Sequence, residues 1–199
     1  MSNNINNSSD INSQCPPENL IARVWQELAR ATKDRHHNWR TPAFASIGLD
    51  GNPQVRTIVL RHANQTLWTL DAYTDSRSPK YHELVKHSRA QLVFWSPRIR
   101  WQLRVSVNAN VHTEGDFVKA AWDRMSQSKS SKDYLSNQVP GSAIISNNVN
   151  EVFSSNTPNN HYLAVLSFQV ISMDWLELGK DLHRRAQIHP NGIVTPLSP

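Results

Sequence analysis

The feature that most restricts the fold is a long stretch of alternating apolar and polar residues at 99–112. Successive side chains of a β-strand point to opposite faces of a sheet, so this pattern predicts one strand with an apolar and a polar face. The apolar set is Ile99, Trp101, Leu103, Val105, Val107, Ala109 and Val111, and the polar set is Arg100, Gln102, Arg104, Ser106, Asn108 and Asn110. A long strand with two unlike faces is typical of the wall of a β-barrel.

Shorter stretches with the same period predict further strands on both sides. They lie at 43–48, 54–61, 66–73, 90–95, 161–171, 174–178 and 182–188, and a short tail follows at 193–199. The turn at 50–53 (Asp-Gly-Asn-Pro) joins the first two strands as a hairpin. Amphipathic helices are predicted at about 18–35 and 115–126, and a short helix is predicted at about 78–87. The expected fold is therefore mainly β (α+β): an antiparallel barrel with flanking helices.

Length and composition fit one domain. The chain has 199 residues, of which 38% are hydrophobic and 19% are charged. Residues 1–15 are dominated by Asn and Ser, so we expect a disordered N-terminal tail there and a single domain over 16–199. The connection at 127–160 has little periodicity, which is typical of a functional or mobile loop.

The composition argues against several other classes of protein. No stretch approaches the roughly 18–20 apolar residues of a membrane span, and the first residues lack the pattern of a secretory signal. Cys15 is the single cysteine, so an internal disulfide is impossible and a cytoplasmic location is the simplest expectation. The net charge of +5 is spread along the chain, so it does not predict nucleic-acid binding. The spacing of His82 and His87 puts them on different helix faces, and no metal site is expected.

Two segments combine cations with a special backbone. Arg56 and Arg61 bracket a β-branched strand, where they either face a ligand or are exposed residues of an edge strand. Ser78 and Pro79 are suited to begin a helix, whose free N–H groups beside Arg77 and Lys80 would hold a phosphate. The alternative for the second segment is an ordinary capped helix with surface cations.

Two further positions suit an aromatic cofactor. Gln102 lies on the polar face of the long strand, and its amide can donate to and accept from the imide-like edge of a flavin. Trp175 would cover an aromatic ring, and the guanidinium of Arg185 would donate to ring nitrogens or oxygens. Equally, Gln102 can be structurally neutral and Trp175 can be a core residue.

Taken in order, these segments resemble the pyridoxamine 5′-phosphate oxidase family, and more closely its FMN-dependent, oxidase-like branch. The family's R-x-V-L-L-K segment along the flavin is similar to 56–61 (RTIVLR). Its Tyr-Thr pair with a following Lys matches Tyr73, Thr74 and Lys80, and its flavin-binding Gln falls on Gln102. Near the C-terminus, its Trp, its L-H-x-R motif and its closing hydrophobic-x-P match Trp175, 182–185 and 197–199.

The resemblance implies an FMN-binding split barrel that oxidises a small substrate, such as a phosphorylated amine, through bound FMN. The implied ligands of the FMN phosphate are Arg56, Arg77, Ser78 and Lys80. The implied contacts to the rest of FMN come from Thr57, Ile58, Val59, Leu60, Arg61, Tyr73, Thr74, Gln102, Trp175 and Arg185. Family members build each site across a dimer interface, so a homodimer is implied, with Trp175 and Arg185 from the second subunit. The residues implied to lie near the substrate are Arg61, His183 and Arg185.

The sequence departs from the family in the substrate half of the site. The Arg that stands two residues before the C-terminal His is Asp181 here, and the Lys that meets the substrate phosphate is Arg61. The mid-chain Tyr, Arg and Ser have no clear counterpart, although Tyr134 and Arg124 fall in that region. Two other interpretations stay open: a non-catalytic split-barrel module that binds flavin or haem, and a nucleic-acid binder on a small barrel.

Overall fold

The computed structural model of the chain describes residues 15–143 and 161–199. Its helices are α2 (Leu20–Lys33), η1 (Asn38–Arg40), α3 (Pro79–Lys86), α4 (Asp116–Met125) and η2 (Lys129–Tyr134). Its strands are β1 (Ala43–Ile47), β2 (Pro53–Thr57), β3 (Leu60–Asn64), β4 (Thr69–Asp75), β5 (Arg89–Ser96), β6 (Trp101–His112), β7 (Leu163–Glu177), β8 (Arg184–Ile188) and β9 (Val194–Leu197). The predicted tail at 1–15 lies outside the described residues except for Cys15, and so does part of the 127–160 connection.

The strands form one antiparallel sheet that closes into a barrel. Its order is β2-β1-β5-β6-β7-β4-β3, and β8 and β9 extend it beside the second half of β7. Strands β2 and β3 lie at opposite ends of this order, yet only Ile58 and Val59 separate them in the sequence. Because so short a link spans roughly 10 Å, the sheet must curl until its two edges approach each other. The prediction of a mainly β antiparallel split barrel is confirmed.

Three details of the strand prediction are wrong. The predicted strand 54–61 is two strands, because the Ile58 N–H donates to the Pro42 carbonyl (3.2 Å) and the buried Ile58 side chain turns the chain inward. The predicted strands 161–171 and 174–178 are one strand, β7. A register shift opposite 106–107 leaves Ile171 as an extra residue, and this bulge interrupts the alternation. The predicted tail at 193–199 contains β9.

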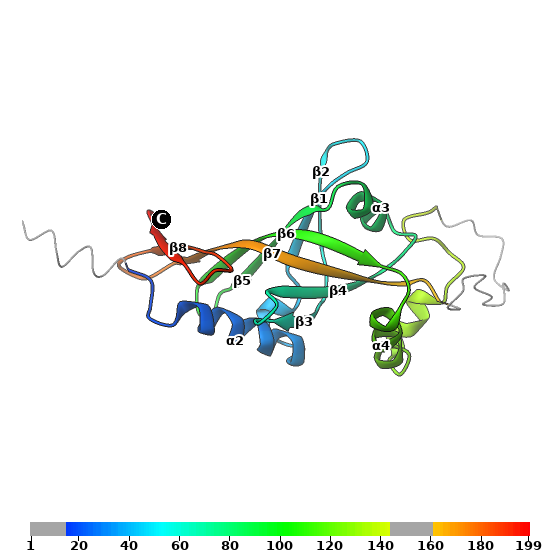
Figure 1. Ribbon diagram of the computed structural model, residues 1–199, viewed down its shortest axis with the longest axis horizontal. Helices are drawn as coiled ribbons and strands as arrows, with labels where there is room; N and C mark the ends of the chain where they lie inside the picture. Colours follow the sequence, from blue (N-terminus) through cyan, green and yellow to red (C-terminus); the bar gives the residue numbers. More distant parts are fainter. Residues whose placement is uncertain (1–14, 144–160) are drawn as a thin grey trace, which may run out of the picture.

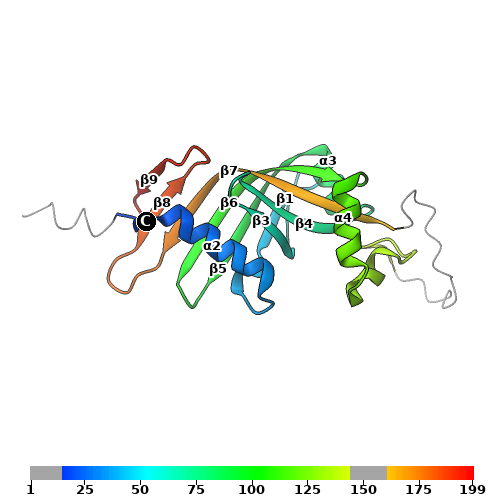
Figure 2. The same ribbon diagram turned by 60° about the horizontal axis from the view of Figure 1, so that its bottom comes forward.

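The predicted helices are confirmed, and they pack against different strands of the barrel. Helix α2 buries Val24, Trp25 and Leu28 and packs against β3. Figures 1 and 2 show α3 and α4 at the end of the molecule opposite to β8 and β9. Strand β6 alternates as predicted, with its apolar face in the core. Within 15–143 and 161–199, every helix is too short or too polar to span a bilayer.

Candidate functional site

A group of polar side chains surrounds the start of α3. The Lys80 Nζ donates to Thr74 Oγ1 at 3.0 Å, and the hydroxyls of Thr74 and Ser78 are 3.0 Å apart. Ser78 is the N-cap residue and Pro79 follows at the first helical position, as predicted. The Ser78 Oγ makes no capping hydrogen bond to the helix, because it faces Thr74. The ammonium group and both hydroxyls are therefore turned toward one another at the helix N-terminus.

Arg56 reaches the same region from β2. Its Nη2 lies 3.1 and 2.8 Å from the two carboxylate oxygens of Glu83, a residue of α3 that is 5% exposed, and its Nη1 donates to Ser46. Burial lowers the pKa of Lys80, and the nearby charge of Arg56 lowers it further, against the opposing effect of Asp75 and Glu83. Two cations held close together, both half-buried, form an arrangement that a bound anion stabilises.

Arg77 forms hydrogen bonds and a ring contact with residues outside this group. Its guanidinium forms a double contact with Asp75 (Nε to Oδ1 3.0 Å, Nη2 to Oδ2 2.6 Å), and its Nη2 also donates to the Ser136 carbonyl at 2.8 Å. The guanidinium carbon lies 3.3 Å from the centre of the Tyr162 ring. The hydrogen bonds to Asp75 raise the pKa of Arg77. The structure thus gives Arg77 contacts that hold the 136–137 segment, and its predicted phosphate contact remains a prediction.

A second cationic site is a cavity of about 260 Å³ beside β3 and β4. The guanidinium of Arg61 lies over the Tyr73 ring at 5.4 Å, and the Arg124 Nη2 is 3.5 Å from the Tyr73 hydroxyl. Among the described residues that line the cavity, none is Asp or Glu. The lining includes Arg40, Arg61, His62, Tyr73, Arg124 and Ser128.

The sequence prediction assigned Arg61 to the substrate and found no clear place for Arg124. The structure brings these two arginines to one cavity, together with Arg40 and Ser128, which the prediction missed. The spacing of Arg124 and Ser128, one helical turn apart near the end of a predicted helix, was an available signal. No local signal pointed to Arg40, because its place depends on how the end of α2 packs against β3.

Gln102, Arg185 and His183 lie elsewhere, toward the outer face of the sheet. The strand register places Gln102 beside Leu176, and Leu176 beside Arg185. The Arg185 guanidinium donates to both carboxylate oxygens of Asp174 (3.0 and 2.8 Å), and Arg104 contacts the same carboxylate. His183 is exposed in the loop before β8. Two arginines therefore share one buried carboxylate on this face.

Asp174 makes the folded state depend on acid pH. Burial alone would raise its pKa, but the hydrogen bonds from Arg185 and Arg104 outweigh that effect and hold the pKa below its ordinary value of 3.8. A lowered pKa stabilises the folded state above about pH 4, and this stabilisation is lost as pH falls through the folded-state pKa.

We expect Asp174→Asn to lower the free energy of unfolding at neutral pH by about 1–2 kcal/mol, a value reduced for the partial exposure of both arginines. The difference from the unchanged chain should shrink as pH falls below about 4. Urea unfolding at several pH values measures both effects. Asp181→Asn, which removes the same charge from an exposed site, is the control. A difference in the free energy of unfolding that stays constant with pH would contradict the lowered pKa of Asp174.

Trp175 lies in the core. Its side chain is 0% exposed, and its ring meets that of Trp101 edge to face at 5.2 Å. It occupies the apolar face of the sheet because its register partners are Leu103 and Ala186, both fully buried. The predicted contact with a flavin of the second subunit does not fit this position, since the ring presents no surface to a neighbour. The alternative interpretation, a core tryptophan, is the one that the structure favours.

One chain therefore does not bring the whole predicted set into a single site. Arg56, Thr74, Ser78 and Lys80 gather at α3, and Arg61 and Tyr73 belong to the neighbouring cavity. The link between these two regions is 57–60: Thr57 is exposed, Ile58 and Leu60 are buried, and Val59 is half-buried. Its predicted contacts to FMN remain predictions, as do those of Gln102 and Arg185.

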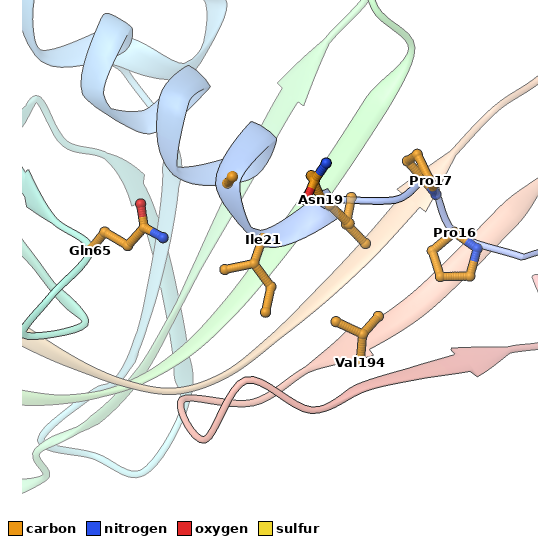
Figure 3. A pocket seen from close by; sticks show the side chains of 8 residues that line it. Pro16, Pro17, Asn19, Ile21, Gln65 and Val194 are labelled. Atoms are coloured by element: carbon orange, nitrogen blue, oxygen red, sulfur yellow. The ribbon is translucent and has the colours of Figure 1, made fainter.

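A larger cavity, of about 460 Å³, lies between the start of α2 and β9. Figure 3 shows Ile21 and Val194 directed toward each other there, with Pro16 and Pro17 at one end. Its described lining has no ionisable side chain. It offers an apolar groove and no group for acid-base or anion chemistry, so we place the candidate site at α3 and the cationic cavity.

Comparison with known sequences identifies part of the chain. Residues 22–113 match the family of the pyridoxamine 5′-phosphate oxidase FMN-binding domain. A pyridoxine/pyridoxamine 5′-phosphate oxidase of Thermosynechococcus vestitus is 36% identical over 65 residues, 33% of this chain and 30% of that protein. The enzyme of the same name from Brucella canis is 31% identical over 100 residues, 50% of this chain and 47% of that protein. The chain thus matches less than half the length of these relatives.

Comparison with solved structures supports the fold over nearly the whole chain. A pyridoxamine 5′-phosphate oxidase-related, FMN-binding protein of Nostoc punctiforme superposes with a TM-score of 0.66 at 20% identity, covering 93% of this chain and 99% of that one. PhzG of Burkholderia lata, solved with tetrahydrophenazine-1-carboxylic acid, gives 0.69 at 20% identity, covering 92% and 94%. The matched segment holds Arg56, Tyr73, Lys80 and Gln102. Residues 22–113 therefore match the pyridoxamine 5′-phosphate oxidase FMN-binding domain family, and the chain as a whole has the split-barrel fold of these solved structures.

Proposed function

We propose that this protein is an FMN-dependent oxidoreductase of the pyridoxamine 5′-phosphate oxidase-like type, which oxidises a small phosphorylated amine. The observation that carries the proposal is the pair of cations, Lys80 and Arg56, held with two buried hydroxyls at the N-terminus of α3. This group lies inside the segment that matches the FMN-binding domain.

The residues at α3 suit the phosphate of FMN. A phosphate needs cations and N–H or O–H donors, and Lys80, Arg56, Thr74 and Ser78 provide them beside the helix N-terminus. A bound dianion would also relieve the mutual repulsion of Lys80 and Arg56, which now rely on Asp75 and Glu83. When bound, FMN supplies the electron chemistry of the oxidation.

The cavity beside Tyr73 suits the charged end of the substrate. Tyr73 and Thr74 are adjacent on β4, so their side chains point to opposite sides: Thr74 toward Lys80 and Tyr73 toward Arg61. The two cationic sites therefore lie on either side of one strand. In this arrangement, Arg61 and Arg124 orient the substrate, and the proposal requires no catalytic acid-base pair.

We further propose that a second copy covers the outer face of the sheet. Val55 and Trp95, which are 69% and 42% exposed, lie on that face, where Trp95 is the register partner of Gln102. Apolar side chains exposed beside polar ones are typical of a subunit interface. A copy seated there would bring Arg185 and His183 to the partner's flavin, a step that a single chain does not accomplish.

The purified protein tests the proposal directly. We expect it to be yellow, with the absorbance bands of an oxidised flavin, to have the mass of a dimer by light scattering, and to release peroxide when given pyridoxamine phosphate. The chain heated until it unfolds, with free FMN added, is the background control. A colourless protein that gives no heat with added FMN in a calorimeter would exclude the cofactor.

A non-catalytic flavin-binding module is the second candidate. It is favoured by Asp181 at the position of the family's substrate Arg, and by the pairing of Arg185 with Asp174, which occupies that guanidinium. A protein that holds flavin, is reoxidised slowly after reduction and makes no peroxide with any amine tested would support this second candidate.

A further inference from the structure

Arg40 is an arginine of the cationic cavity to which the proposed function gives no task. Arg40 is the last residue of η1. It follows Ala31, a residue near the end of α2, by 9 positions in the sequence. Its Nη1 donates to the carbonyls of Ala31 (3.1 Å) and Thr32 (2.9 Å), which belong to the last turn of the helix. Those carbonyls have no partner within the helix, so the contact both satisfies them and fixes the guanidinium.

The rest of the Arg40 guanidinium is uncommitted. Among residues 15–143 and 161–199, neither its Nε nor its Nη2 has a hydrogen bond or ion pair. Arg40 is half-buried and lines the cavity with Arg61 and Arg124. Burial lowers the pKa of Arg40, and the charges of Arg61 and Arg35 lower it further, with Asp34 as the opposing charge.

The lining of the cavity is therefore strongly positive, and the opposing charge of the buried Asp71, which acts on His62 and Arg124, lies outside the lining. Arg61 contacts the Tyr73 ring, and Arg124 lies near the Tyr73 hydroxyl. Neither they nor Arg40 forms an ion pair within the described part of the chain. Three guanidinium groups around about 260 Å³, without a lining carboxylate, match a ligand that brings more than one negative charge.

We propose that Arg40 is a specificity-determining residue of this cavity, which selects a doubly charged phosphate monoester over a singly charged carboxylate. This inference rests on the proposed function, whose substrate site it deepens. The end of α2 holds Arg40 rigidly, so its free N–H groups are available to a phosphate oxygen without reordering the side chain. A carboxylate has fewer oxygens and one charge, and Arg61 with Arg124 suffices for it.

The test compares Arg40→Gln with Arg35→Gln in the flavin-loaded protein. Arg35 is exposed, also acts on Arg40 through its charge, and does not line the cavity, so both variants lose the same charge. The probes are inorganic phosphate, mostly the dianion at about pH 8, and acetate, with affinities measured by calorimetry. We expect Arg40→Gln to weaken phosphate binding roughly 10-fold and acetate binding less than about 3-fold. Arg35→Gln should leave both nearly unchanged.

Equal phosphate affinity in the two variants would overturn the assignment. Should Arg40→Gln fail to fold, the unchanged chain carries the test through phenylglyoxal modification mapped by mass spectrometry. Phosphate should then protect Arg40, Arg61 and Arg124 but not Arg35, and an unprotected Arg40 overturns the assignment as well. The flavin absorbance of each sample shows whether FMN is bound, and it therefore tests the proposed function independently of the Arg40 assignment. A chain without flavin is titrated in a Lys80→Ala background, which removes one of the two cations of the other anion site.

Discussion

We expect the Arg56→Ala/Lys80→Ala protein to bind FMN about 10²- to 10⁴-fold more weakly than the unchanged chain. Each substitution removes one charge-assisted contact to the phosphate, and such contacts contribute roughly 1.5–3 kcal/mol each. The buried surroundings of Lys80 and its lowered pKa make this the largest expected effect on binding, because its charge is poorly screened by water. Calorimetry or quenching of flavin fluorescence measures the affinity.

Arg56 also neutralises the buried Glu83, so its removal alone would destabilise the fold. We therefore combine Arg56→Ala with Glu83→Gln, which leaves no unpaired carboxylate, and monitor the fold by circular dichroism. Lys86→Ala is the matched control: it removes one charge from the far end of the same helix, where Lys86 is exposed and donates to the Leu49 carbonyl. An FMN affinity equal to that of the control would contradict the assignment of Arg56 and Lys80 to the phosphate site.

The second large effect concerns stability. We expect Trp175→Ala to lower the free energy of unfolding by about 3–5 kcal/mol in the flavin-free protein, because a fully buried aromatic side chain leaves a cavity when truncated. The ring also loses its edge-to-face contact with Trp101. Urea unfolding followed by circular dichroism measures the change.

Trp175→Phe is the matched control, since it keeps most of the apolar volume, and we expect it to cost about 1–2 kcal/mol. The two variants also separate the two interpretations of this residue. If Trp175 covered the flavin of a partner subunit, its truncation would weaken FMN binding and leave the flavin-free stability almost unchanged. That outcome would contradict the assignment of Trp175 to the core.

Much of the secondary structure followed from local periodicity. The alternation at 99–112 predicted β6, and the 3.6-residue spacing of Leu20, Val24 and Leu28 predicted α2. Periodicity failed where a local irregularity interrupts it. Because the bulge at Ile171 interrupts the alternation, β7 was predicted as two strands. The inward turn at Ile58 leaves the residue types along the chain unchanged, so β2 and β3 were predicted as one strand.

The candidate site was predicted in part. Thr74, Ser78 and Lys80 meet because they lie within one strand, turn and helix start, so their sequence spacing sets their distance. Arg77, in the same segment, pairs with Asp75 and contacts the 136–137 segment, which the sequence did not predict; its contact to the phosphate remains a prediction. Its direction depends on a partner distant in the sequence, which spacing does not reveal.

The residue pattern alone determined the strand and helix types, the family resemblance and the cationic, hydroxyl-rich character of the start of α3. Tertiary structure alone decided that Arg40, Arg61 and Arg124 line one cavity and that Trp175 is a core residue. The physical reason is the range of the interactions. Backbone propensity and side-chain alternation act over a few neighbouring residues, whereas a cavity depends on the register and closure of strands far apart in the chain.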